Sequence, residues 1–415
     1  MTSKTLEIDN PKFYSASSAL RGFSFRPHTH HLAVLTQASG KDVISIHKPK
    51  TREVQRAWFP DTIDAHGLVW SPDGRWLVVW ESAAQGHKVL FYTSDGHLFK
   101  DWRGPVSVAE NGDLGPGIKL AAFSPDGHHV AISDGSSCIC MVNALSMSEE
   151  MRLQHPHVIQ PRDTLQVSRS EMRSGTWSLT VKIWQEQKYH PNARPAAPVF
   201  HRAAQPVVPL SQPPHGLQET KSGCNLALFD SSSTLLATRL EDAPSTIWIW
   251  DIPTSELRAV LMYHAKVNQV EWHPVSPELL LMRCEGEDYG GVAFAWDPLS
   301  EGPRCVDFAH QLPGGNVSGN KDRVIWLKSN TDPAAIFFSD KTACILGSLT
   351  ERCGETLPWT DEPEPLDRDR PRSADLPLDR AASPRAYSDI SDLSDMDEGG
   401  SELNDTFDFK RLGQP

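Results

Sequence analysis

The chain has 415 residues, 39% of them hydrophobic and 22% charged, which is enough for one large domain or two ordinary ones. The formal net charge is −13, and residues 354–415, with 16 acidic and 7 basic side chains, carry −9 of it. The remainder is nearly neutral and lacks the basic face that a non-specific nucleic-acid binder needs. No window of the sequence has the run of about 20 apolar residues that spans a bilayer, and the N-terminus has no secretory signal. Seven cysteines without a CxxC pair predict neither a zinc site nor a disulfide framework, and a cytosolic or nuclear compartment follows.

A repeated hairpin begins after the N-terminal leader, residues 1–17. The segments 68–80 and 120–132 each have a strand that ends in an aromatic residue, a Ser-Pro-Asp-Gly turn and a second apolar strand. Proline fixes one corner of the turn and Asp-Gly tolerates left-handed backbone at the next, so the chain reverses tightly. Looser copies lie at 23–27, 226–230 and 270–274. The markers of the two clear copies are Trp70, Asp73, Gly74, Phe123, Asp126 and Gly127.

A third and a fourth strand follow each hairpin, at a spacing of roughly 40 to 45 residues. The third strand ends in a Trp-Asp dipeptide at Trp250-Asp251 and again at Trp296-Asp297. His264 stands where such repeats often carry a histidine, ahead of a strand that ends at Trp272. We therefore predict an all-β, WD40-type β-propeller with about six blades, three in residues 18–153 and three in 223–349. The alternative is a β-sandwich with similar turns.

A long interruption separates the third and fourth blades. Residues 154–222 form a Pro- and Gln-rich insertion, and its second half, Pro191 to Pro214, has no hydrophobic period and is expected to be an exposed excursion. Apolar and polar residues alternate along 177–184, which predicts one strand that either completes a blade or pairs on an edge.

The C-terminal tail, residues 354–415, is acidic, broken by prolines and predicted to be disordered. Ser383 precedes a proline, and Ser388, Ser391 and Ser394 each precede an aspartate, so all four are candidate phosphorylation sites; the alternative is unmodified serine. An aromatic and basic island stands out in the tail and is a candidate docking motif, with chance as its alternative. It comprises Thr406, Phe407, Phe409, Lys410 and Arg411.

The search for catalytic chemistry finds no nucleophile elbow, phosphate-binding loop or metalloprotease pair. His28–His31 lies in a hairpin turn without a nearby carboxylate or cysteine, and Cys138 and Cys140 are better explained as packed thiols in a sheet than as ligands. We expect the protein to have no enzymatic activity and to bind no metal or cofactor. We expect it to bind other proteins at the rims of its blades. The tryptophans are assigned to packing between blades: Trp70, Trp80, Trp102, Trp248, Trp250, Trp272 and Trp296.

Several stretches resemble one family more closely than WD repeats in general. These are 77–81, 88–98, 117–125, 155–159, 235–239, 243–252 and 257–261. They are similar to the WRAP-type WD-repeat family of centrosomes and fungal spindle pole bodies, the family encoded antisense to the p53-related tumour-suppressor gene. The similarity covers roughly residues 20–350, and family members carry about three more blades before the position of Leu20, so the N-terminal blades are expected to be missing here.

The resemblance implies a scaffold in cytoplasm and cytoskeleton, at the spindle pole body or another microtubule-organising centre. Its implied partners are a coiled-coil anchoring protein and a minus-end-directed kinesin-14, with which it holds microtubule minus ends and supports the mitotic spindle. Two alternatives stay open. One is an adaptor of another complex, such as a ubiquitin-ligase receptor or an RNA-processing scaffold; the other is a propeller hydrolase, which needs convergent acids or a metal at the central opening.

Overall fold

A computed structural model describes residues 22–104, 115–162, 180–187, 198–211, 223–308, 323–328, 334–340, 343–349 and 356–358. The chain divides after residue 360, and all of the described residues precede that point. Their regular structure consists of β-strands and two short 3-10 turns, η1 (Ala83–Gln85) and η4 (Glu287–Tyr289), which confirms the predicted all-β class. No helix in these ranges has the length and apolar character needed to cross a bilayer.

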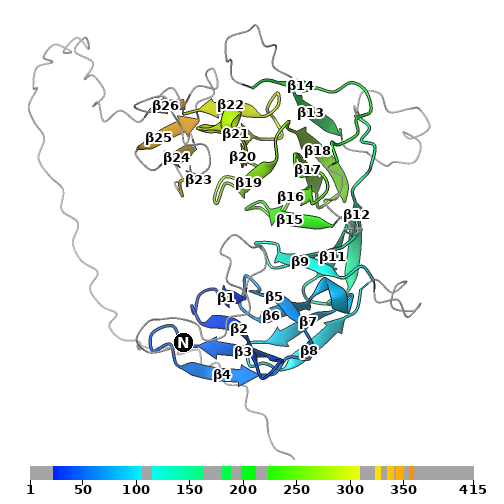
Figure 1. Cartoon of the computed structure of the whole chain (residues 1–415), viewed down its shortest axis with the longest axis vertical. Coiled ribbons are helices and arrows are strands. Elements are labelled where there is room, and N and C mark those ends of the chain that lie inside the picture. The colour runs from blue at the N-terminus through cyan, green and yellow to red at the C-terminus, as the bar shows by residue number, and fades with distance from the viewer. Residues whose placement is uncertain are drawn as a thin grey trace, which may run out of the picture. The chain divides into compact units, whose positions relative to one another are not determined.

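The strands form six sheets in chain order, each with a core of four consecutive antiparallel strands, and the fourth sheet has two further strands (Figure 1). The first sheet contains β1 (Phe23–Phe25), β2 (Leu32–Ala38), β3 (Lys41–His47) and β4 (Val54–Trp58). The second contains β5 (Ala65–Trp70), β6 (Trp76–Glu81), β7 (Val89–Thr93) and β8 (Leu98–Trp102). The third contains β9 (Ile118–Phe123), β10 (His129–Asp134), β11 (Cys138–Asn143) and β12 (Glu149–Gln154).

The remaining three sheets repeat the same order. The fourth contains β15 (Cys224–Phe229), β16 (Leu235–Leu240), β17 (Thr246–Asp251) and β18 (Glu256–Met262). The fifth contains β19 (Val267–Trp272), β20 (Leu280–Cys284), β21 (Val292–Trp296) and β22 (Arg304–Asp307). The sixth contains β23 (Arg323–Trp326), β24 (Ala335–Ser339), β25 (Cys344–Leu349) and β26 (Thr356–Pro358).

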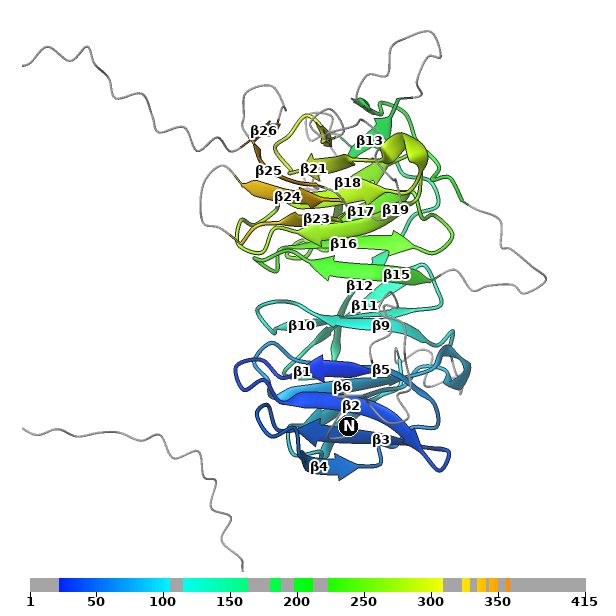
Figure 2. The same cartoon turned by 60° about the vertical axis from the view of Figure 1, so that its left-hand side comes forward.

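The sheets pack face to face in sequence, so that the first strand of one sheet contacts the first strand of the next at β1–β5, β5–β9, β9–β15 and β15–β19. Figure 2 shows these sheets stacked one after another. A separate buried hydrophobic cluster fills each of the five interfaces between consecutive sheets. Four-stranded sheets that cover the apolar faces of their neighbours in this order are the blades of a β-propeller.

The Ser-Pro-Asp-Gly turns have the predicted geometry. Gly74 has φ +70° and Gly127 has φ +74°, in the left-handed region that glycine adopts without strain. In the first turn the Ser71 hydroxyl donates to Asp73 Oδ1 at 2.5 Å and accepts from the Trp76 backbone N–H at 2.9 Å. The serine and the aspartate therefore satisfy the backbone groups that the reversal leaves unpaired.

A β-bulge recurs in the last strand of the first four blades. One residue of that strand is skipped in the pairing with the third strand, at Gln55, Phe99, Glu150 and Arg258. A bulge of this kind adds one unpaired residue, bends the strand and re-aims a side chain. The fourth strand of each of these blades therefore has one residue outside the ladder; Gln55, Phe99 and Glu150 are exposed, and Arg258 is half-buried.

The insertion adds two strands to the fourth blade. β13 (Lys182–Glu186) runs parallel to β18, and β14 (Phe200–Arg202) pairs antiparallel to β13, so this sheet has six strands. The alternating segment 177–184 thus pairs on an edge, with its first three residues outside the described ranges. The stretch 191–214, predicted to be an exposed excursion, contains the short strand β14, and most of its described residues are exposed. The Phe200 ring of β14 packs edge-on against Tyr263 and Phe294.

Candidate protein-interaction site

The inserted strand β13 is fixed to the next blade by a buried carboxylate. Glu186, the last residue of β13, is 7% exposed. Its two oxygens accept from the Tyr289 hydroxyl at 2.8 and 2.9 Å, and one also accepts from the backbone N–H of His264 at 2.8 Å. Burial and the bond to Glu186 raise the pKa of Tyr289 well above its usual range, so the phenol keeps its proton and donates.

An open hollow of about 620 Å³ lies over this contact, and we call it the insertion groove. Amide and imidazole side chains line it beside two exposed aliphatic residues, Val208 at 62% and Leu210 at 60% exposure. Exposed aliphatic side chains next to hydrogen-bonding groups are typical of protein interfaces rather than of enclosed small-molecule pockets. The residues that define the groove are Gln185, Gln187, His201, Val208, Leu210 and His264.

A buried hydrogen-bond relay stiffens the blade that carries the insertion. The Trp250 indole N–H donates to Thr238 Oγ1 at 2.9 Å, and Thr238 Oγ1 lies 2.8 Å from His155 Nε2. His155 Nδ1 lies 2.8 Å from the Ser137 carbonyl, which can only accept, so Nδ1 carries the proton and Nε2 accepts from the Thr238 hydroxyl. Burial lowers the pKa of His155 to about 4, consistent with a neutral ring.

The role of His155 was missed by sequence reasoning, which marked His264 as the repeat histidine. His264 is exposed and contacts Glu186 through its backbone N–H, whereas His155 is 2% exposed and lies at the start of the insertion. The insertion separates His155 from the strands with which it bonds, since Thr238 follows 83 residues later. One signal in the sequence could have identified His155. It directly follows the last strand of a blade, β12, and this is the position at which a chain without an insertion enters the next blade.

The predicted repeat markers lie in turns and blade interfaces. Asp73 and Asp126 accept backbone N–H groups in their turns. Asp251 accepts from the Thr254 N–H at 3.1 Å and Asp297 from the Leu299 N–H at 2.9 Å, so both aspartates shape the loops after the third strands. The aromatic markers belong to the interface clusters: Trp70, Trp80, Trp102, Phe123, Trp248, Trp250, Trp272 and Trp296.

Two other groups of candidate ligands lie apart from the insertion groove. His28 and His30 occupy the first hairpin turn with φ of 62° and 57°, and the Cys138 and Cys140 thiols lie on β11. The hydrogen bond with Cys138 and burial raise the pKa of the Cys140 thiol. No cluster of three or more metal-ligating side chains occurs among the residues that the structure describes.

The tail candidates lie outside the described residues. These are Ser383, Ser388, Ser391, Ser394, Thr406, Phe407, Phe409, Lys410 and Arg411. They remain predictions.

No family model matches the chain. It is 26% identical over 308 residues to the WD repeat-containing protein WRAP73 of Mus musculus, which covers 71% of this chain and 60% of that protein. It is 22% identical over 270 residues to an uncharacterized WD repeat-containing protein of Schizosaccharomyces pombe, which covers 63% of this chain and 49% of the other. The chain therefore spans between half and three fifths of the length of these curated relatives.

Similar solved structures include a chain of the mitotic checkpoint complex, with a TM-score of 0.48 and 13% identity over 85% of this chain and 82% of that one. Another is the β-propeller domain of Cps50 (Swd1) from Myceliophteria thermophila, with a TM-score of 0.41 and 13% identity over 81% and 84% of the two chains. The repeated four-stranded sheets and the similarity to these two WD repeat-containing proteins agree with each other. The chain has a WD-repeat β-propeller fold and is similar in sequence to the WRAP-type WD-repeat proteins.

Proposed function

We propose that this protein is a non-enzymatic scaffold that helps to anchor microtubule minus ends at the spindle pole body or centrosome and so supports the mitotic spindle. The coarser part of this function, an adaptor that binds other proteins, follows from the propeller fold and the WD-repeat relatives. The resemblance to the WRAP family supports the finer part: a cytoskeletal location, a coiled-coil anchoring partner and a minus-end-directed kinesin-14.

The observation that carries the adaptor function is the insertion groove. Its aliphatic residues Val208 and Leu210 are exposed to solvent on the segment that follows β14, and the backbone of this segment is held by two hydrogen bonds between Val207 and Ile159, at 2.8 and 2.9 Å. A rigid support lowers the entropic cost of binding because the surface is already ordered before the partner arrives. We assign the docking of the anchoring partner to this groove.

The test is affinity purification of the tagged full chain from dividing cells, together with imaging of its position. We expect the native protein to recover a coiled-coil protein and a minus-end-directed kinesin and to concentrate at spindle poles. The double variant Val208→Asp, Leu210→Asp places charge in the groove and should lose both partners. The control, Val54→Asp with Leu145→Asp, changes two similarly exposed aliphatic residues on other blades and should keep them.

Two results would overturn the proposal. Recovery of ubiquitin-ligase or RNA-processing subunits by the native chain, without the coiled-coil protein and kinesin, would assign it to another complex. Equal loss of partners in the control variant would show that the insertion groove has no special part in docking.

A further inference from the structure

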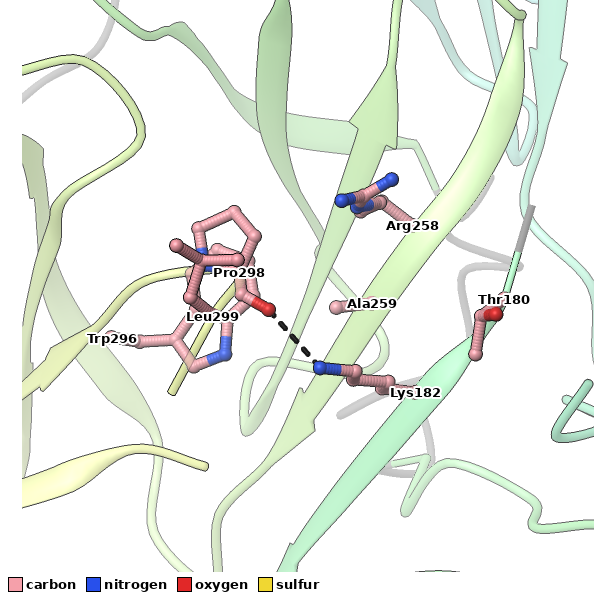
Figure 3. A pocket seen from close by; sticks show the side chains of 7 residues that line it. All are labelled: Thr180, Lys182, Arg258, Ala259, Trp296, Pro298 and Leu299. Carbon is pink, nitrogen blue, oxygen red and sulfur yellow. Dashed lines mark hydrogen bonds between the residues drawn. The ribbon is translucent and has the colours of Figure 1, made fainter. Parts of the chain in front are cut away.

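A second hollow lies beside the inserted strand, between β13, β18 and the loop that follows β21 (Figure 3). Its volume is about 210 Å³, smaller than the roughly 300 to 1,000 Å³ of sites that enclose a small molecule, so it suits one or two side chains of a peptide. We call it the cationic groove and define it by Lys182, Arg258, Trp296, Pro298 and Leu299. It shares no lining residue with the insertion groove.

Local structure places two cations on one side of this hollow. Lys182 pairs with Ala259 in the parallel register, and Ala259 packs in the cluster that faces the fifth blade, so Lys182 faces that blade as well. Arg258 is the unpaired residue of the bulge between β17 and β18, which re-aims its side chain out of the ladder. Figure 3 shows both side chains directed toward the loop that carries Pro298 and Leu299.

Several N–H donors in the groove have no acceptor among the described residues. Lys182 Nζ donates to the Pro298 carbonyl at 3.1 Å, which takes one of its three hydrogens. The Arg258 guanidinium has no hydrogen bond or ion pair with any described residue, and the indole Nε1 of Trp296, a residue only 1% exposed, has no acceptor among them. None of the residues that line the groove is a carboxylate.

An apolar surface adjoins these donors. Leu299 is 87% exposed and follows Pro298, whose ring forms part of the same wall in Figure 3. The backbone of this loop is held in place because Asp297 accepts from the Leu299 N–H. The cationic groove thus offers a fixed aliphatic contact next to two positive charges.

We propose that the cationic groove binds an acidic peptide segment of a partner protein, in which an aspartate or glutamate adjoins a leucine, isoleucine or methionine. The carboxylate accepts hydrogen bonds from Arg258 and Lys182, and the aliphatic side chain packs on Leu299 and Pro298. Charge complementarity carries this assignment, since a carboxylate is the acceptor that guanidinium binds in bidentate geometry. The inference concerns peptide chemistry and does not rest on the spindle-pole role.

The experiment measures the fluorescence anisotropy of a labelled peptide, Ser-Asp-Ile-Ser-Asp-Leu-Ser-Asp-Met, with the purified full chain. Because both partners are partly exposed charges, binding should weaken when NaCl rises from about 50 mM to about 500 mM. We expect Arg258→Gln and Lys182→Gln each to lower affinity about tenfold, as the loss of one charge-assisted hydrogen bond does. Leu299→Ser should weaken binding as well, and a peptide with Asn in place of each Asp should not bind.

The controls are Arg56→Gln and Leu145→Ser, an exposed cation and an exposed aliphatic residue on other blades, which should leave binding unchanged. Unfolding midpoints of all variants show that they are folded. Binding that survives Arg258→Gln, Lys182→Gln and Leu299→Ser, or equal binding of the Asn peptide, would overturn the proposal.

A further arm identifies the source of the peptide, since residues 388–396 of this chain have the same sequence as the probe. The titration is repeated with the full chain in which Asp389, Asp392 and Asp395 are replaced by Asn. Unchanged affinity supports a partner protein as the source. Affinity that rises tenfold or more in this background would overturn that assignment.

Discussion

Arg26 and Gly74 lie 48 residues apart and join the hairpin turns of the first two blades. The Arg26 Nε donates to the Gly74 carbonyl at 2.8 Å, and its guanidinium lies over the Trp70 ring, 5.5 Å from the centroid. A comparable contact joins the third and fourth blades, where the Asp126 N–H donates to Ser233 Oγ at 3.0 Å. Side chains in the turns thus connect consecutive blades along one rim.

Arg26→Ala should lower the free energy of unfolding by about 1 to 2 kcal/mol, because it removes both the hydrogen bond and the cation–π contact. Urea unfolding followed by tryptophan fluorescence measures this change. Arg75→Ala is the matched control in the adjoining turn: its ion pair with Asp73, at 3.4 Å, is exposed and should contribute less than about 0.5 kcal/mol. Equal effects of the two variants would contradict a role for the turn contact.

Glu186→Leu should destabilise the fourth and fifth blades by at least about 2 kcal/mol. Leucine has no acceptor, so the Tyr289 hydroxyl and the His264 N–H both lose their partner at a buried position. Tyr289→Phe removes one donor and should cost about 1 to 2 kcal/mol.

A double-mutant cycle on urea unfolding separates the pair from its surroundings. The coupling energy between Glu186 and Tyr289 should exceed about 0.5 kcal/mol, as for residues in direct contact. Additive effects would mean that the hydroxyl and the carboxylate do not interact.

Thr238→Val should cost about 2 to 4 kcal/mol although it preserves volume. The Thr238 hydroxyl accepts from the Trp250 indole and donates to His155, and valine leaves both of those buried groups unpaired. Thr238→Ser keeps the hydroxyl and should recover most of the loss. Thermal unfolding of the three proteins decides between a polar and a purely steric role for this residue.

The stability of the fold should fall in mild acid because of His155. Its pKa in the folded chain is lowered to about 4, against about 6.5 when unfolded, so between these values the unfolded chain binds the proton and the folded chain does not. The free energy of unfolding therefore has its full value above pH 6.5 and decreases as the pH falls toward 4, by roughly 3 kcal/mol at most.

Urea unfolding across this pH range, compared with His155→Gln, isolates the histidine from other acidic transitions. The variant lacks a titrating ring, so the difference in stability between the two proteins should shrink as the pH falls. A constant difference would show that His155 does not titrate with the predicted shift.

The sequence predicts the hairpins well because their determinants are local. Gly74 and Asp73 lie within one turn, and proline and glycine restrict that turn whatever surrounds it. By contrast, the contacts of Glu186 and His155 join residues 103 and 83 positions apart, and no local pattern specifies them.

The bulge at Arg258 escapes prediction for a different reason. The alternation of β18 is interrupted by one residue, and the pairing with β17 decides which residue is skipped. The cationic groove depends on that choice, so it becomes visible only when the blade is assembled.

The order of strands in the fourth blade has a consequence for synthesis on the ribosome. β13 leaves the exit tunnel before β18, the strand on which it rests, and the chain between their last residues, Glu186 and Met262, takes roughly 4 to 15 s to make at about 5 to 20 residues per second. During that interval Ile183 and Trp184 lack Val260 and Leu261, the residues of β18 with which they pair. Apolar side chains of β13 are therefore exposed to aggregation until β18 is made.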